Sequence, residues 1–337
     1  SRDHLLAFLA KEEDPSSGGR QMPQHYGHRE LNIVSQSSST ATQFLQAVGA
    51  GFALQRDGEK GVVYVSSGEG TSSQGDFHEA LNWTSREKAP VIFHIENNHY
   101  AISVPIKDQT AGGSVYKISA GYDNLARFNV EGTDFFETHL AFKKAVERAR
   151  KGKGPSLIQS DVVRLLPHSS SDDQRKYRSE EDLEADRNRD PLLTFANTCI
   201  EAGVAKQEEF NKILELVKSQ VDADAEWAEA QPDPDSNESL KNVYKTVVPK
   251  DTPESSPNSG DKIVLVDAIN HALDEELTHN DKMMIYGQDV AGGKGGVFTA
   301  TRGLTDKHGI DRVFNSPLAE SSIIGTAIGL ATLGYKP

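Results

Sequence analysis

Cysteine and long apolar runs are almost absent from this sequence. Cys199 is the single cysteine in 337 residues, which excludes an intramolecular disulfide and a metal centre built from several cysteines. No run of 18 apolar residues occurs, and the first residues, SRDHLLAFLAKEED, have the wrong charge and too short an apolar stretch for a secretory signal. We therefore expect a cytoplasmic protein that makes no membrane contact.

Basic residues are also in short supply. Lysine and arginine number 36 against 50 acidic residues, which gives a net charge of −14 and a pI near 5.3. This charge argues against nucleic acid or an anionic membrane surface as a partner. At 36.8 kDa the chain exceeds one domain of usual size, so we expect two domains.

The most informative stretch is a strand, a turn, a helix and a second strand in the first third of the chain. Val62–Val65 and Val91–Ile95 are short β-branched runs, and Phe77–Arg86 between them has helical spacing without glycine or proline. This pattern predicts a βαβ unit with parallel strands. Neighbouring parallel strands end at the same edge of a sheet, which would bring the turn Gly68-Glu69-Gly70 next to the loop Asn97-Asn98.

A carboxylate and an amide oxygen that meet at such an edge are hard oxygen ligands, which suit a magnesium ion that also binds phosphate. Glycines in the turn allow the backbone to approach a diphosphate closely. Glu69 and Asn98 therefore predict a site for a metal ion and a diphosphate group. The alternative is an ordinary β-turn-α unit in which Glu69 caps a helix in solvent.

Resemblance to a known family supports the first interpretation. The 27 residues between Gly70 and Asn98, with GDFHEALNW and NNHYAISVP around them, resemble the thiamine diphosphate motif, in particular that of the α part of the decarboxylating first component of 2-oxoacid dehydrogenase complexes. The resemblance implies a thiamine diphosphate-binding α/β fold, with a parallel sheet flanked by helices. It also implies Mg²⁺ ligands at Glu69, Asn98 and the Tyr100 carbonyl, and cofactor contacts at Gly70 and Thr71. Glu at the centre of the turn, in place of the usual Asp, is similar to branched-chain members.

Hydroxyl residues stand before the helical pattern Phe44–Leu54, which by itself is typical of a helix N-cap. In the resembled family the equivalent turn holds a potassium ion and faces the cofactor. The implied potassium ligands are Ser37, Ser39, Thr42 and Gln43, and the implied cofactor contacts are Ser38 and Thr40. Ser39 stands where the family usually has proline. Small residues at Gly49–Gly51 predict a close-packed helix interface.

Residues 164–178 lack periodicity and should form a loop after the predicted strand Ser156–Val163. From His168 to Arg178 they resemble the flexible active-site loop of the family, HS-x-SDD-x-x-x-YR. By this resemblance His168 is a catalytic residue that reaches the cofactor, and Ser169 occupies the place of a phosphorylation switch in animal relatives. We expect the loop to be mobile without ligand. Without the resemblance, His168 would be an ordinary surface residue.

The rest of the first 261 residues gives weaker patterns. Helices are predicted at 4–10, 135–150, 180–189, 192–202 and 207–230, a strand at 128–132, and a glycine-rich loop at 106–122. Gln231–Asp261 is rich in proline, aspartate, serine and asparagine, which predicts an extended linker.

Residues 262–337 show a second α/β pattern. Helices are predicted at 263–277, 299–308 and 323–333, and strands at 283–286 and 313–314. The segment resembles the start of the β part of the family through GQDV, GGVF and SPLAE, with Gln288 in place of a customary Glu. The resemblance therefore implies an α-like diphosphate domain at 1–230, a linker at 231–261 and an incomplete pyrimidine-binding domain at 262–337, fused in one polypeptide and lacking family sequence at both ends.

The resemblance also implies a reaction. Glu320 of SPLAE would be the carboxylic acid that hydrogen-bonds the pyrimidine ring of the cofactor, and burial against that ring should raise its pKa. The reaction would be oxidative decarboxylation of a 2-oxoacid, with 2-oxoisovalerate favoured, followed by acyl transfer to a lipoyl-bearing acyltransferase. A homodimer is expected, because the two halves of the cofactor bind different domains, often of different chains.

Two alternatives stay open. The chain could be the pyruvate or acetoin dehydrogenase component of the same family, whereas His168-Ser169 together with the β motifs argues against a transketolase. It could also be a non-catalytic fragment that serves as an assembly module.

Overall fold

The structure is a computed structural model that describes residues 1–35, 37–241, 243–244, 260 and 262–337. The chain forms two compact units, and each combines segments that are far apart in the sequence. The first unit is made of Ser1–Ser38 with Lys206–Leu265, and the second of Ser39–Ala205 with Val266–Pro337. The division into a diphosphate and a pyrimidine domain stays a prediction.

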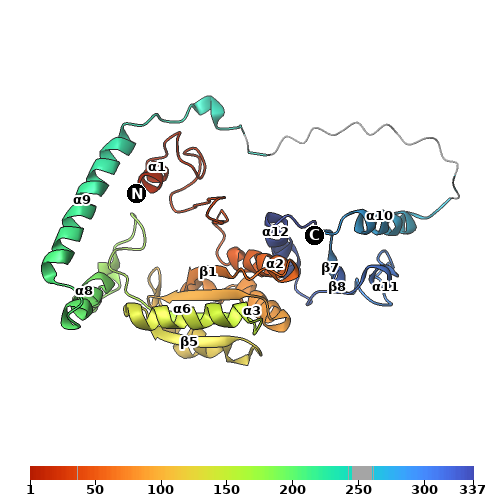
Figure 1. The fold of residues 1–337 in the computed structure, drawn as a ribbon, viewed down its shortest axis with the longest axis horizontal. Coiled ribbons are helices and arrows are strands. Elements are labelled where there is room, and N and C mark those ends of the chain that lie inside the picture. The colour runs from red at the N-terminus through yellow and green to blue at the C-terminus, as the bar shows by residue number, and fades with distance from the viewer. Residues whose placement is uncertain (36, 242, 245–259, 261) are drawn as a thin grey trace. The chain divides into compact units, whose positions relative to one another are not determined.

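In the first unit, α1 (Arg2–Phe8) packs on the long helix α9 (Gln207–Glu229), as Figure 1 shows. Arg2 Nε donates to Asp224 Oδ1 at 2.8 Å, and the guanidinium lies 4.5 Å from the centroid of the Trp227 ring. The ion pair of Arg2 with the buried Asp224 carboxylate holds the two helices together, and so does the contact of Arg2 with the Trp227 ring.

Beyond α9 the chain returns to the N-terminal segment before the short turn η5 (Ser236–Glu238). Lys11 Nζ donates to Asp233 Oδ1 at 2.8 Å, and Glu12 N donates to Pro232 O at 3.0 Å. Pro232 and Asp233 open the predicted linker, of which residues 242, 245–259 and 261 lie outside the described residues.

The second unit contains a four-stranded parallel sheet in the order β1-β2-β6-β5. Its strands are β1 (Val63–Gly68), β2 (Val91–Asn97), β5 (Ala126–Glu131) and β6 (Ser156–Asp161). All four were predicted, and the prediction of a βαβ unit with adjacent parallel strands is confirmed. β1 and β2 run two or three residues past their predicted ends, up to the residues of the motif.

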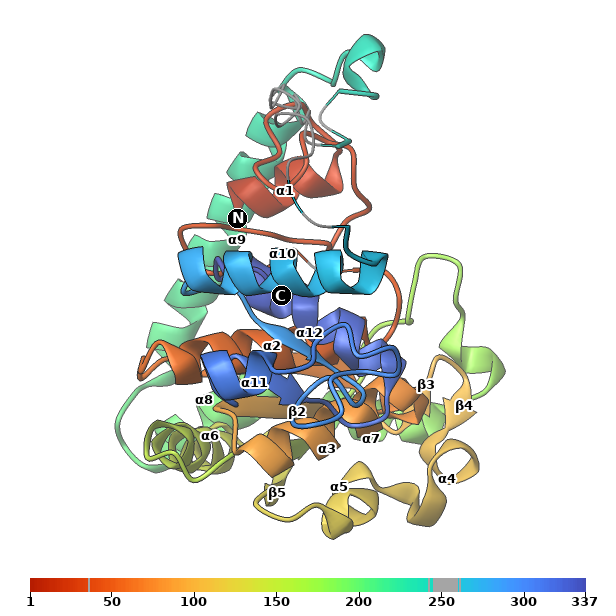
Figure 2. The same ribbon diagram turned by 90° about the vertical axis from the view of Figure 1, so that its right-hand side faces the viewer.

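Helices cover both faces of this sheet. On one face α2 (Thr42–Arg56) and α3 (Gly75–Glu87) bury a core in which the Phe44 and Phe77 rings meet at 5.1 Å. On the other face α6 (Phe135–Arg150) packs its alanines against Ile92, Val130 and Ile158. The predicted fold, a parallel sheet flanked by helices, is confirmed (Figures 1 and 2).

The later part of the second unit has a two-stranded parallel sheet. Its elements are α10 (Leu265–His279), β7 (Ile285–Gly287), α11 (Leu304–His308), β8 (Val313–Asn315) and α12 (Glu320–Thr332), and β7 pairs with β8. The helix predicted at 299–308 begins only at Leu304. Thr299 and Gly303 have φ of 64° and 79°, which no α-helix accommodates.

Helices α2 and α12 lie against each other, which both views show (Figures 1 and 2). A methyl group on Gly49 would lie 2.0 Å from Thr326 O, and one on Gly329 would lie 1.9 Å from Gln46 O. The two backbones are therefore in direct contact, because neither glycine has a Cβ. The prediction of a close-packed interface at Gly49 is confirmed.

The predicted loop 106–122 contains two four-residue helices, α4 (Ile106–Gln109) and α5 (Val115–Ile118), so that prediction is wrong in part. Helices of this length carry no periodicity, and glycines separate them. The remaining elements are a hairpin of β3 (Tyr100–Ala101) and β4 (Val104–Pro105), and the helices α7 (Glu180–Asn188) and α8 (Pro191–Glu201). Among the described residues, none of the helices has the length and apolar character to cross a membrane.

Candidate active site

The predicted motif comes together at the carboxyl edge of the sheet. The turn η1 (Glu69–Ser73) follows β1, and Asn98 follows β2, which is the neighbour of β1. Asn98 N donates to Glu69 Oε2 at 3.2 Å, and Tyr100 N donates to Asn98 Oδ1 at 3.1 Å. The structure thus places Glu69, Asn98 and Tyr100 in one hydrogen-bonded group, as the strand order predicted.

Glu69 is buried, with 1% of its surface exposed. Its Oε1 has no hydrogen-bond partner, and burial raises the pKa of the carboxyl although Asn98 N donates to the other oxygen. The alternative in which Glu69 caps a helix in solvent is therefore wrong. A buried carboxylate oxygen without a partner is costly unless a cation neutralises it, so this group fits a metal ion.

The oxygen atoms available around Glu69 limit which metal ion could bind there. Within the described ranges, no group of three or more His, Cys, Asp or Glu side chains could hold a metal. An ion at Glu69 must therefore also use amide and carbonyl oxygens, such as those of Asn98 and Tyr100. This set of hard oxygens suits Mg²⁺ better than zinc or iron.

Side chains that contact the backbone of η1 fix the shape of this turn. Glu69 O accepts from Ser72 Oγ at 2.6 Å and from Gln109 Nε2 at 3.3 Å, and a methyl group on Gly70 would lie 2.8 Å from Ala101 Cβ. Thr71 follows in the same turn and is partly buried. Gln109 belongs to α4, which the sequence did not predict, so this support for the turn was missed.

His168 is exposed on its loop. The loop closes through Asp172 Oδ2, which accepts from His168 N at 2.9 Å and from the Tyr177 hydroxyl at 2.7 Å. The Tyr177 bond is the larger cause that lowers the pKa of the Asp172 carboxyl. Ser169 Oγ lies 3.1 Å from Ser171 Oγ in the same loop.

Arg164 links this loop to the residues after the motif. Its guanidinium donates to the Tyr177 hydroxyl at 2.7 Å and to Ile102 O at 2.8 Å, and the rings of Tyr100 and Tyr177 lie 6.0 Å apart. We predicted no role for Arg164, because its partners lie 62 and 13 positions away. The loop of His168 is therefore attached next to Tyr100.

Glu320 is the first residue of α12 and is exposed. Its pKa lies below the usual value, with the Gln288 side chain as the largest cause. Gln288 Nε2 is buried and makes no hydrogen bond of normal geometry. The Gln288 amide therefore lowers the pKa of Glu320 because it lies close to the carboxyl, without a fully formed hydrogen bond. The expectation of a raised pKa is wrong for the chain alone, because none of its described residues covers the Glu320 carboxyl.

One contact positions the start of α12. Glu79 of α3 accepts from Ser322 N at 2.9 Å and from Ser322 Oγ at 2.7 Å, so a carboxylate satisfies a free N–H of the first turn. The sequence missed Glu79 because its partner is 243 positions away. The helix that begins with Glu320 is thereby tied to the helix that follows the Glu69 turn.

The predicted potassium and cofactor residues around the hydroxyl run fall in both units. Ser37 and Ser38 belong to the first unit, and Ser39, Thr40, Thr42 and Gln43 to the second. Thr42 Oγ1 donates to Ser39 O at 2.9 Å, Gln43 Nε2 donates to Ser66 O at 3.5 Å, and Thr40 Oγ1 accepts from Gln74 Nε2 at 3.4 Å. The potassium site stays a prediction.

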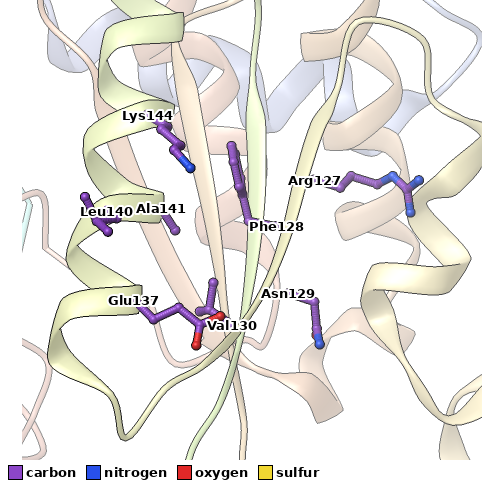
Figure 3. Close-up of a pocket in the computed structure, with 8 residues that line it drawn as sticks. All are labelled: Arg127, Phe128, Asn129, Val130, Glu137, Leu140, Ala141 and Lys144. Atoms are coloured by element: carbon purple, nitrogen blue, oxygen red, sulfur yellow. The ribbon is translucent and has the colours of Figure 1, made fainter.

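A pocket of about 360 Å³ lies beside β5 and α6, between residues such as Phe128, Val130, Leu140 and Lys144 (Figure 3). It contains none of the residues predicted for the site. The candidate site is instead the edge of the sheet at Glu69.

The sheet, its helices and the Glu69 edge define an α/β protein of the class that binds thiamine diphosphate. The chain matches the model of the dehydrogenase E1 component over residues 1–237 and that of the transketolase pyrimidine binding domain over residues 261–337. It belongs to the dehydrogenase E1 component family, as the sequence predicted, and the two matched families imply thiamine diphosphate as the cofactor.

The curated relatives include the 2-oxoisovalerate dehydrogenase subunit alpha of Bacillus subtilis, 40% identical over 72% of this chain and 74% of that protein. The human mitochondrial 2-oxoisovalerate dehydrogenase subunit alpha is 35% identical over 67% of this chain and 51% of that protein. The pyruvate dehydrogenase E1 component subunit alpha of B. subtilis is 33% identical over 67% of this chain and 60% of that protein. The chain thus spans about half the length of the human relative.

Among solved structures, the transketolase from Leishmania mexicana has a TM-score of 0.53 and 17% sequence identity, and the match covers 98% of this chain and 52% of that one. This likeness supports the fold.

Proposed function

We propose that this protein catalyses the oxidative decarboxylation of a 2-oxoacid, with 2-oxoisovalerate as the preferred substrate. The buried Glu69 carboxylate, whose Oε1 has no partner, carries the proposal, because a folded protein keeps such a group where an ion binds. The relatives named above, which include 2-oxoisovalerate dehydrogenase subunits, support the substrate.

Each site residue has a role in this proposal. Glu69, Asn98 and the Tyr100 carbonyl hold Mg²⁺, while Gly70 and Thr71 approach the diphosphate. Thiamine diphosphate, when bound, would supply a nucleophilic carbon and an electron sink for the decarboxylation. Two further residues act on protons and on the acyl group: Glu320 holds a proton at the pyrimidine ring, and His168 reaches the site from its loop.

The same proposal includes partners and location. The acyl group passes to a lipoyl-bearing acyltransferase, and two copies of the chain form a homodimer. A potassium ion at Ser37, Ser39, Thr42 and Gln43 supports the cofactor-facing residues Ser38 and Thr40. The acidic charge and the single cysteine favour a cytoplasmic location and no nucleic acid as a partner.

Titration of thiamine diphosphate with Mg²⁺ by calorimetry tests the site. Asn98→Ala removes one oxygen ligand and no core volume, so it should abolish magnesium-dependent binding while the circular dichroism spectrum stays the same. Asn211→Ala, an exposed asparagine on α9, is the control and should bind like the wild type. Unchanged affinity in Asn98→Ala contradicts the metal assignment, and absence of binding by the wild-type chain favours a non-catalytic assembly module.

Pyruvate is the second candidate substrate, because a relative named as a pyruvate dehydrogenase component covers 67% of this chain. Steady-state rates of the full-length protein with 2-oxoisovalerate, pyruvate and 2-oxoglutarate decide between them. A higher kcat/KM for pyruvate contradicts the branched-chain assignment.

A further inference from the structure

A second pocket, of about 510 Å³, lies in the second unit at the amino ends of the strands. α2 ends shortly before β1 begins, α3 ends shortly before β2, and β8 begins directly after residue 312. The residues of the candidate active site follow the carboxyl ends of β1 and β2, so this pocket is a separate place in the same unit. The side chains that matter in it are Arg56, Glu87, Asp281, Met284, Asp311 and Arg312.

Arg56, the last residue of α2, offers the pocket a guanidinium that rests on aromatic rings. Its central carbon lies 4.9 Å from the centroid of the Phe314 ring and 5.6 Å from that of the Phe52 ring. Ring contacts use the face of a guanidinium and leave the N–H groups at its edge available. In the described part of the chain, no hydrogen bond or ion pair occupies those N–H groups. Arg56 therefore presents the donor fork that binds a carboxylate with two hydrogen bonds.

Three carboxylates line the same pocket. Desolvation lowers the pKa of Arg56, and the charges of Glu87 and Asp311 are among those that oppose this shift, so both acids lie near the guanidinium. Gln55 Nε2 donates to Glu87 O at 3.1 Å, which ties the end of α3 to the end of α2. Within the described ranges no three acidic, histidine or cysteine side chains converge on a metal position. The carboxylates therefore suit an organic cation, which needs no common coordination point.

The rest of the lining supplies a fixed charge and an apolar surface. The guanidinium of Arg312 donates to Met283 O at 3.0 Å, to Leu277 O at 3.0 Å and to Asn280 O at 2.6 Å, so carbonyl oxygens hold it in place. Met284 is buried, with 3% of its surface exposed. The pocket thus combines two cations, three anions and one apolar side chain.

We propose that this pocket binds a small α-amino acid with an aliphatic side chain. Its carboxylate bonds with the edge of Arg56, its ammonium group lies among the carboxylates, and its side chain contacts Met284. A ligand with only negative charge would meet three carboxylates, and a ligand with only positive charge would meet two guanidinium groups. A zwitterion is favoured by both sets of charges.

The position of the pocket gives such a ligand a regulatory effect. Residues 56 and 87 belong to the segment that matches the dehydrogenase E1 component, and residues 281–312 to the segment that matches the pyrimidine binding domain. One amino acid would contact both segments and so stabilise their packing. The inference goes beyond the proposed function and does not depend on it, because binding at this pocket needs no cofactor.

Three ligands of similar shape test the need for both charges, by calorimetry on the full-length protein. L-Valine has both charged groups, 3-methylbutanoate lacks the ammonium group, and isobutylamine lacks the carboxylate. L-Valine should bind at least about tenfold more tightly than either, the scale of one hydrogen bond to a charged group. Equal affinities for the three ligands, or no binding of L-valine, would overturn the proposal.

Two substitutions assign the charges to residues. Arg56→Gln should weaken L-valine and 3-methylbutanoate by about tenfold and leave isobutylamine unchanged. Asp311→Asn should weaken L-valine and isobutylamine by about threefold, since two carboxylates remain, and should not weaken 3-methylbutanoate. Arg302→Gln, at an exposed arginine outside the pocket, is the control and should bind like the wild type. Wild-type affinity for L-valine in both pocket variants contradicts the site.

A further comparison separates this pocket from the candidate active site. L-Valine should bind Asn98→Ala as it binds the wild type, and it should raise the melting temperature of both but not that of Arg56→Gln. Loss of L-valine binding in Asn98→Ala, with binding retained in Arg56→Gln, would move the ligand to the Glu69 edge and overturn the inference. A protein that binds thiamine diphosphate with Mg²⁺ and no L-valine would refute the inference alone and leave the proposed function standing.

Discussion

Glu69 is the residue at which folding stability and cofactor binding make opposite demands. Its pKa in the folded chain is raised by burial, so the folded state favours the neutral acid more than the unfolded state does. The stability it contributes is present below the unfolded pKa of 4.5 and is lost as the pH rises through the folded value. At neutral pH the burial of Glu69 therefore costs the cofactor-free chain stability.

Glu69→Gln should stabilise the cofactor-free protein and disable it. Glutamine has no ionised form to desolvate, so the free energy of unfolding at neutral pH should rise by about 1 to 3 kcal/mol, the scale of the desolvation penalty of a buried group. Thermal melts with and without thiamine diphosphate and Mg²⁺ measure both effects, since only the wild type should be stabilised by the ligands. A lower melting temperature of ligand-free Glu69→Gln would show that the carboxylate is structural.

Glu320→Gln should slow the reaction and leave cofactor binding unchanged. The amide keeps the shape of the side chain and cannot exchange a proton with the pyrimidine ring, whereas the contacts at Glu69 and Asn98 are untouched. Turnover and hydrogen–deuterium exchange at the thiazolium carbon of the bound cofactor should fall by about a hundredfold or more. Equal exchange rates in the full-length wild type and variant would leave Glu320 as a structural carboxylate.

At the scale of elements, the local patterns were predictable and the tertiary contacts were not. Two strands and the helix between them form as expected, because apolar spacing alone decides a strand or a helix of that length; they are Val63–Gly68, Gly75–Glu87 and Val91–Asn97. The meeting of Glu69 with Asn98 followed from the strand order. The burial of Glu69, the exposure of Glu320 and the bond between Glu79 and Ser322 depend on how distant segments pack, which no local pattern encodes.

The loop that bears His168 should be the most labile element near the site. Residues 165–171 are exposed, and Asp172 and Arg164 hold the loop by hydrogen bonds of exposed and partly buried groups. Limited proteolysis and hydrogen exchange of the cofactor-free protein should cut and exchange 165–178 before β2. Thiamine diphosphate with Mg²⁺ should protect the loop; equal protection of the loop and β2 without ligand contradicts its mobility.

At the scale of the whole molecule, one histidine joins three strands of the sheet. The His94 ring on β2 bonds with the Tyr64 hydroxyl on β1 and with Ser160 Oγ on β6, both at 2.9 Å. Burial lowers the pKa of His94, and the nearby Glu96 opposes that shift only partly. The sheet is therefore built around a neutral imidazole.

Acid should weaken the fold through this group. Because the folded pKa is depressed, the stability contributed by neutral His94 is complete above the unfolded value of 6.5 and is lost as the pH falls through the folded value. Chemical denaturation over a pH series should show the free energy of unfolding decreasing below about pH 6.5. His94→Gln should lower the plateau and flatten this decrease, whereas the exposed His139→Gln should not; identical slopes would contradict the assignment.

The glycine contact between α2 and α12 has a consequence for protein synthesis. Residue 332, the end of α12, leaves the ribosome 276 positions after residue 56, the end of α2. At usual translation rates of 5 to 20 residues per second, the surface of α2 that faces α12 stays uncovered for about 14 to 55 s. Nascent chains therefore carry an uncovered small-residue surface until α12 emerges, and we expect their yield in a cell to depend on chaperones that shield that surface until then.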